Sequence, residues 1–144
     1  MKATCVGLTI VLATACGPSG PPEPFHGQWK VSSVIAPGVS AQSPADAGRR
    51  VGTIVSLEAG RVRVGDRTCG GATYTRRNLS AEVFAEAYRV TPQQLSLAGD
   101  PIALVDVICE SGALELGSTL ILKSDTAMLT TWDGVFYVLT KANQ

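Results

Sequence analysis

Residues 127–140 read AMLTTWDGVFYVLT and contain the strongest hairpin signal in the chain. Asp133-Gly134 is a dipeptide that short hairpin turns prefer, because both central positions of a type I′ turn need a positive φ. Apolar residues alternate with others on both sides of it, which is typical of paired strands. We therefore predict antiparallel strands over 127–132 and 135–140. The register expected from such a turn places Trp132 opposite Val135, Thr131 opposite Phe136, Thr130 opposite Tyr137, Leu129 opposite Val138 and Met128 opposite Leu139.

A second hairpin is predicted from strands over 51–58 and 61–65, joined by Ala59-Gly60. One of its faces is apolar and the other polar. An antiparallel pair of this kind covers a core on one side and meets water on the other. The expected register places Val55 opposite Val64, Ser56 opposite Arg63, Leu57 opposite Val62 and Glu58 opposite Arg61.

The stretch 102–109, IALVDVIC, is apolar on both faces of a predicted strand. Neighbouring residues such as Leu104 and Val105 belong to opposite faces, because side chains alternate along a strand. Both faces must therefore be covered. We expect the interior of a barrel to cover one face, and inserted helices that contain Phe84 and Leu95 to cover the other.

Further strands are expected over 29–35 and 113–123. Short helices are predicted over 43–50, 80–88 and 91–97, where Ser43, Ser80 and Thr91 are suitable N-caps. Many short strands with turn signals suit either a sandwich or a barrel, and the stretch 102–109 favours the barrel. We predict a mainly β domain, a small antiparallel barrel of about seven or eight strands with short inserted helices.

Composition excludes several functional classes. The 144 residues have a formal net charge of zero, 45% are hydrophobic and 17% are charged. A neutral chain lacks the basic surface that nucleic-acid binding needs. A single histidine, His26, removes most catalytic and zinc arrangements. We therefore predict a protein that is not an enzyme, with no catalytic residues, no metal site and no cofactor.

The N-terminal residues predict export. Lys2 is followed by an apolar run over 6–15, which is typical of a secretory signal peptide over residues 1–15. The run ends in Leu12-Ala13-Thr14-Ala15-Cys16-Gly17. This stretch resembles the lipobox of bacterial lipoproteins, which implies that Cys16 is acylated and becomes the first residue. The alternative is an ordinary cleavage near Ala15 that leaves Cys16 as a free thiol.

Residues 16–24 then form the acylated cysteine and a Pro/Gly-rich tether, and residues 25–141 form the folded domain. The resemblance implies a bacterial protein held by its lipid at a membrane, which we expect to be the outer membrane on its periplasmic side. Stable anchoring by acyl chains follows from burial of their methylene groups.

The four cysteines divide by position. Cys5 lies in the signal peptide and Cys16 at the lipobox, which leaves Cys69 and Cys109 for the domain. Two cysteines in an exported protein predict a disulfide. The alternative is a pair of buried free thiols. A metal site is not expected, because the chain has no CxxC motif.

The domain opens with Phe25-His26-Gly27-Gln28-Trp29. The Gly-X-Trp of Gly27 and Trp29 resembles the motif that begins the first strand of lipocalins and other calycin barrels. The resemblance implies a lipocalin-like barrel in which Trp29 plugs one end. It also implies that a basic side chain after the last strand packs over this tryptophan, and Lys141 is the candidate.

A few polar residues stand out as candidates for a site. Asp106 lies between Leu104 and Ile108 on one strand face, so it must pair with an arginine, lie at an opening or serve a function. His26 is either a base or ligand, or a surface residue near Trp29. Six arginines gather between 61 and 89 and form either an anion or lipid-headgroup contact or a solvated face: Arg61, Arg63, Arg67, Arg76, Arg77 and Arg89.

These observations predict a membrane-anchored, non-catalytic module. Its partners are the membrane, through the lipid on Cys16, and an unknown protein or small apolar ligand. An interaction protein would have a filled barrel, and a carrier would have an apolar lumen. We favour the interaction protein, with a carrier of a small apolar ligand as the alternative, because the predicted strands are few and short.

Overall fold

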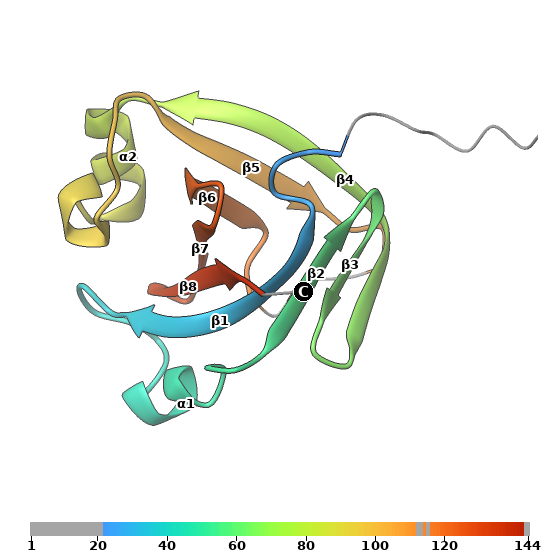
Figure 1. The fold of residues 1–144 in the computed structure, drawn as a ribbon. Helices are drawn as coiled ribbons and strands as arrows, with labels where there is room; N and C mark the ends of the chain where they lie inside the picture. The colour runs from blue at the N-terminus through green and yellow to red at the C-terminus, as the bar shows by residue number, and fades with distance from the viewer. Residues whose placement is uncertain (1–21, 112–113, 115, 143–144) are drawn as a thin grey trace, which may run out of the picture.

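The fold is a closed antiparallel sheet, seen in a computed structural model that describes residues 22–111, 114 and 116–142 (Figure 1). In this part of the chain, eight strands follow one another around the sheet in sequence order, and the last pairs with the first. The mainly β, antiparallel class is therefore confirmed. The strands are β1 (Gly27–Ile35), β2 (Ile54–Glu58), β3 (Gly60–Val64), β4 (Arg67–Leu79), β5 (Ile102–Ile108), β6 (Thr119–Ser124), β7 (Ala127–Trp132) and β8 (Val135–Lys141).

Both predicted hairpins have the predicted registers. In β7 and β8, Trp132 faces Val135 and every further pair follows as expected. Asp133 and Gly134 both have a positive φ, of 50° and 80°. In β2 and β3, Glu58 faces Arg61 and Leu57 faces Val62, so the two-residue turn at Ala59-Gly60 is also as expected, and β3 begins at its second residue.

Three strand predictions need correction. The strand β4, of 13 residues, was not expected, because its sequence is rich in threonine, glycine and arginine. The strand expected from Val51 begins at Ile54, since Gly52 has a φ of 95° and donates its N–H to the Val31 carbonyl instead. The strand expected from residue 113 begins at Thr119, and Ala113 itself lies outside the described residues.

The barrel-like sheet has two ends, and we name them for what lies there. At the closed end β1 begins, β8 ends, and turns join β2 to β3 and β6 to β7. At the rim end lie the β7–β8 turn, the β5–β6 loop and the β1–β2 connection, which contains α1 (Pro44–Gly48). The first described residues therefore join the sheet at the closed end.

The helices begin at the predicted caps. Ser43, Ser80 and Thr91 each accept a backbone N–H from the first turn of α1, α2 (Ala81–Tyr88) and η1 (Pro92–Leu95). The first helix ends at Gly48 rather than Arg50, and the third is a single 3₁₀ turn that ends at Leu95.

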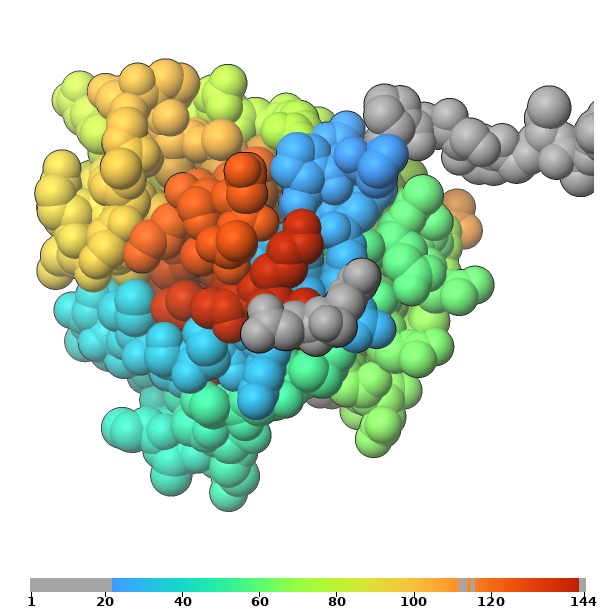
Figure 2. Space-filling model, viewed as in Figure 1, coloured from blue at the N-terminus to red at the C-terminus, as the bar shows by residue number. Residues whose placement is uncertain are grey.

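Two apolar clusters cover the two faces of the sheet. The inner cluster fills the interior and includes Val105 of β5. The outer cluster lies between the sheet and the α2–η1 segment, where Phe84 and Leu95 contact the face of Leu104. Figure 2 shows this segment, in yellow, lying against the strands in orange and red. The double cover predicted for residues 102–109 is therefore confirmed.

Candidate functional site

The interior of the sheet is filled by the chain's own side chains. A residual cavity of about 10 Å³ remains there. A single water needs about that much space, and pockets for small molecules begin at about 300 Å³. Within the part of the chain that the structure describes, the interior therefore has no cavity of the size that a small-molecule ligand needs. The largest side chains that fill it are Trp29, Tyr137, Leu57, Met128 and Leu139, each no more than 1% exposed.

Leu116, from the β5–β6 loop, completes this filling. Its side chain belongs to the inner cluster and is 3% exposed. Its carbonyl oxygen accepts a hydrogen bond from the buried Thr130 hydroxyl. The next residue, Gly117, has a φ of 86°, and a Cβ there would overlap the Thr131 carbonyl. The backbone at these two residues therefore lies directly on β7.

Trp29 closes the other end of the interior. Its side chain is 1% exposed, and its Nε1 donates to the Phe25 carbonyl at 2.9 Å. The Lys141 Nζ lies 5.5 Å from the centre of the Trp29 ring, within the range of a cation–π contact. Gly27 lies beside the Lys141 side chain, since a Cβ built there would be 3.8 Å from the Lys141 Cε. The contact that the calycin resemblance implies for Lys141 is therefore present.

Aromatic and charged contacts fix the residues before β1 to the barrel. The rings of Phe25 and Tyr74 lie 5.1 Å apart, and the Arg76 guanidinium lies 5.4 Å from the Phe25 ring centre. The Arg76 Nη2 also forms an ion pair with Glu23 at 2.5 Å. The point where the chain joins the barrel is therefore held in a defined place.

His26 belongs to the same joint. Its backbone N–H donates to the Glu23 carbonyl at 2.8 Å, and its Nδ1 accepts the Glu23 N–H at 3.3 Å. Its ring lies edge-on to Phe25 and Tyr74. Its Nε2 is buried and has no hydrogen-bond partner in the described part of the chain. His26 is therefore a partly buried residue that shapes the joint, and no acid or nucleophile is paired with it there.

A groove lies beside this joint, at the closed end. It has a volume of about 240 Å³ and runs between the residues before β1 and the β6–β7 turn. Figure 2 shows the first described residues, in blue, next to this turn, in orange. The lining combines an apolar floor with a polar margin: Pro24, Phe25, Trp29, Leu122 and Met128, then Lys123, Ser124 and Asp125.

The rim end carries two hollows, and Trp132 and Asp133 line both of them. One hollow, of about 270 Å³, also involves Val107 and Thr119, and the other, of about 500 Å³, involves Arg49 and residues before it. The segment before α1 is tied to this turn, because Gln42 donates to the Trp132 carbonyl at 3.2 Å. A partly exposed tryptophan between two hollows is a typical contact residue of protein interfaces.

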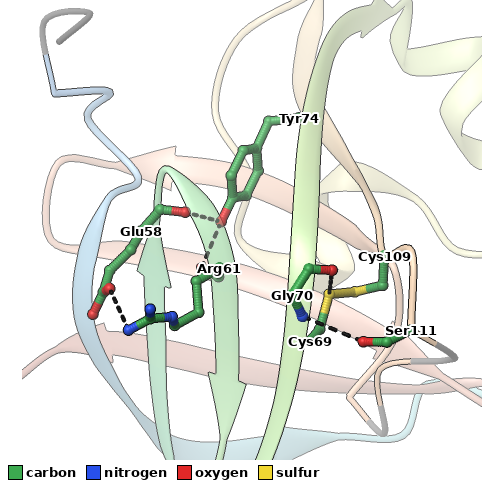
Figure 3. Close-up of a disulfide and its surroundings, with 7 residues drawn as sticks. All are labelled: Glu58, Arg61, Cys69, Gly70, Tyr74, Cys109 and Ser111. Atoms are coloured by element: carbon green, nitrogen blue, oxygen red, sulfur yellow. Dashed lines mark hydrogen bonds and ion pairs between the residues drawn. A yellow bond between two sulfur atoms is a disulfide. The ribbon is translucent and has the colours of Figure 1, made fainter. Parts of the chain in front are cut away.

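The predicted disulfide is present and lies at the rim end (Figure 3). It joins Cys69, near the start of β4, to Cys109, directly after β5, with Cα atoms 5.7 Å apart. The first half of β4 pairs with β3 and the second half with β5. The bridge therefore connects β4 and β5 where their backbone pairing has ended.

Asp106 pairs with Arg77 on the outer face of the sheet. The Arg77 Nε donates to the carboxylate at 2.6 Å, and the Thr119 hydroxyl donates at 2.8 Å. The hydrogen bond from Arg77 lowers the pKa of Asp106, and the same contact raises the pKa of Arg77. Arg77 also reaches the Tyr88 hydroxyl, so the pair ties α2 to the sheet. Of the three alternatives for Asp106, pairing with an arginine is the one observed.

The six arginines do not converge on one site. Arg61 pairs with Glu58, Arg76 with Glu23, and Arg77 with Asp106. No group of three or more metal-binding side chains occurs among the residues described. None of the helices in that same part of the chain has the length and apolar character to cross a membrane. Cys16 lies outside the described residues.

Comparisons with known proteins give no match: no family model, no curated protein and no solved structure matches this chain. The candidate sites are therefore the closed-end groove and the rim hollows. The sequence indicated Trp29 and Lys141 of the closed end. It gave no signal for Leu122 and Met128 as groove residues or for Leu116 as the residue that fills the interior.

Proposed function

We propose that the chain is an exported bacterial lipoprotein, held at the outer membrane by acyl groups on Cys16. Its lipocalin-like barrel acts as a non-catalytic interaction module for a protein partner. The filled interior is the observation that supports a binding surface over a carrier, because only about 10 Å³ is empty. A carrier of a small apolar molecule needs an open lumen.

The rim end is the surface we assign to the partner. The chain joins the barrel at the closed end, on the side of the proposed anchor, and the rim lies at the other end of the strands. The rim carries Trp132 between its two hollows and Arg49 beside one of them. Tryptophan and arginine dominate the energetics of many protein interfaces.

Mass spectrometry of the chain extracted from its own membrane tests the proposal. The N-terminal peptide should begin at Cys16 and carry diacylglycerol, and native spectra should show a protein partner. A peptide that starts at an unmodified Cys16 would contradict the lipoprotein assignment. A retained small apolar molecule without a protein partner would contradict the interaction module and favour the carrier.

Variants at the rim test the surface. Trp132→Ala should reduce recovery of the partner at least about tenfold, since truncation of a central interface tryptophan has effects of that size. Arg49→Glu reverses the charge of an exposed side chain in the second hollow. It should reduce recovery of the partner without unfolding the chain, so it separates lost binding from lost folding. Val83→Ala, at a half-exposed site on α2, is the control and should leave recovery unchanged. Equal recovery for all three variants would contradict a rim surface.

A further inference from the structure

We infer that the closed-end groove binds an acyl chain of an anionic membrane phospholipid, with Lys123 and Lys141 at the phosphate of the headgroup. The inference rests on the proposed anchoring through Cys16 and extends it to a second contact with the membrane. The groove is distinct from the residual cavity of the interior, but Phe25, Trp29 and Met128, which line it, belong to the inner cluster.

The lining of the groove has the chemistry of an acyl chain site. Phe25, Trp29 and Met128 are all at least 98% buried in the structure and form apolar walls. Pro24 and the partly buried Leu122 extend this apolar surface toward solvent. A polar group placed against these walls would lose its hydrogen bonds to water, whereas a hydrocarbon chain has none to lose. An acyl chain is therefore a better occupant than a polar ligand.

One lysine lines the groove, and a second lies next to one of its lining residues. Lys123 lines it directly, and Lys141 lies over Trp29, whose ring forms part of the floor. The Lys141 N–H donates to the Thr126 carbonyl at 3.0 Å, so its strand is held beside the β6–β7 turn. Among the residues that the structure describes, neither ammonium group forms an ion pair. Asp125 also lines the groove, so one carboxylate lies near the two ammonium groups.

The position of the groove brings it close to the membrane. Pro24, which lines it, follows Cys16 by eight residues. Eight extended residues span at most about 28 Å, roughly the thickness of one bilayer core. An acylated Cys16 therefore keeps the groove within reach of lipid headgroups. Anionic lipids fit it better than zwitterionic ones, because the two lysines beside the groove outnumber the one carboxylate, that of Asp125, in its lining.

Tryptophan quenching by brominated lipids tests the inference, because the two tryptophans lie at opposite ends of the barrel. The full, acylated chain is placed in phosphatidylcholine vesicles that contain a minor fraction of phosphatidylglycerol brominated in the middle of its acyl chains. The Trp132→Phe variant reports Trp29 alone. Brominated phosphatidylglycerol should at least halve its fluorescence, and brominated phosphatidylcholine at the same mole fraction should quench it much less.

Lysine variants separate a site from general attraction to the membrane. In the Trp132→Phe background, Lys123→Gln with Lys141→Gln should remove the preference for phosphatidylglycerol. Lys30→Gln, on an exposed position of β1, is the matched control and should keep it. Equal quenching by both lipids, or a preference that survives in the double variant, overturns the inference. If the groove held the acyl group of Cys16 itself, added lipid would not quench Trp29, which also overturns it.

The same sample distinguishes the two levels of the proposal. Its N-terminal peptide is measured by mass spectrometry before any quenching. An unmodified Cys16 contradicts the proposed function. An acylated Cys16 with unselective quenching contradicts only the lipid site.

Discussion

At the scale of single residues, Tyr74 shows how a polar group is kept inside the joint of the closed end. Its hydroxyl donates to the Glu58 carbonyl at 2.9 Å and lies 3.3 Å from the Arg61 carbonyl (Figure 3). Burial raises the pKa of Tyr74 from 10.0 to about 12. The folded state therefore favours the neutral phenol of Tyr74 over the phenolate.

This pKa predicts a loss of stability in alkali. Between pH 10 and about 12 the unfolded chain loses the Tyr74 proton and the folded chain keeps it, so stability falls as the pH rises. Tyr74→Phe should lose about 1 kcal/mol at neutral pH, for one hydrogen bond, and should show a smaller decrease above pH 10. Urea unfolding from pH 7 to 11 measures both effects. The same alkaline slope in the variant and the wild type would contradict this role.

Asp106 has the opposite sign of pH dependence. Arg77 lowers the pKa of its carboxyl group below 3.8. Its contribution to stability is therefore complete above the ordinary pKa of an aspartate and disappears as the pH falls through the lowered value. Asp106→Asn should cost about 0.5–1 kcal/mol at pH 7, because the pair is about one-third exposed and solvent screens it.

Chemical denaturation at pH 7 and at pH 3 checks this prediction. The difference between Asp106→Asn and the wild type should shrink at the lower pH. Asp125→Asn, at an exposed turn position, is a control for loss of an aspartate as such. A difference that stays constant with pH would mean that Asp106 acts through packing alone.

At the scale of elements, the sequence predicted what local turn chemistry determines. Asp133 and Gly134 set the β7–β8 register because both adopt a positive φ. The strand β4 was missed because its alternation is broken. Gly71, whose φ is 66°, is an extra residue in β4, because Gly70 pairs with Arg61 and Ala72 pairs with Gly60. This bulge interrupts the alternation of faces, so the sequence shows no continuous apolar face.

The candidate sites divide in the same way. Trp29 was predictable from the Gly-X-Trp motif, and Lys141 was predictable from its position at the end of the last strand. The groove was not, because it forms where residues before β1 meet a turn about 100 positions later. The disulfide was predictable by counting cysteines, although the site it stabilises depends on the missed strand β4.

The disulfide predicts a large change in stability. It closes a loop of 40 residues, so its loss should lower the free energy of unfolding by about 3–4 kcal/mol. Denaturant unfolding of the Cys69→Ala/Cys109→Ala variant measures this loss. Ser111→Ala removes a nearby hydrogen bond to the Gly70 N–H and should cost far less, which makes it the control. Equal stability of wild type and double variant would contradict a structural role for the bridge.

At the scale of the whole molecule, one strand joins the two apolar clusters. Val105 and Val107 of β5 belong to the inner cluster, and Ile102 and Leu104 belong to the outer one. The α2–η1 segment therefore covers apolar surface that the closed sheet would otherwise expose to water. Loss of either cluster would expose one apolar face of β5 to water.

The double use of β5 predicts a single cooperative unfolding transition. Phe84→Ala removes a fully buried ring from the outer cluster and should cost about 3–5 kcal/mol. Trp29 and Trp132 contact the inner cluster, so their fluorescence reports the interior. In the variant, tryptophan fluorescence and the far-ultraviolet circular dichroism of the helices should shift together to lower denaturant.

Coincidence of the two signals is what separates one folding unit from a barrel with an attached helical segment. If α2 and η1 were an independent addition, Phe84→Ala would lower only the helical transition and leave the tryptophan transition where it is in the wild type. Val83→Ala changes the half-exposed neighbour of Phe84 and should shift neither signal by much. Because Leu104 and Val105 are adjacent in one strand, we expect a loss on the outer face to destabilise the filled interior as well.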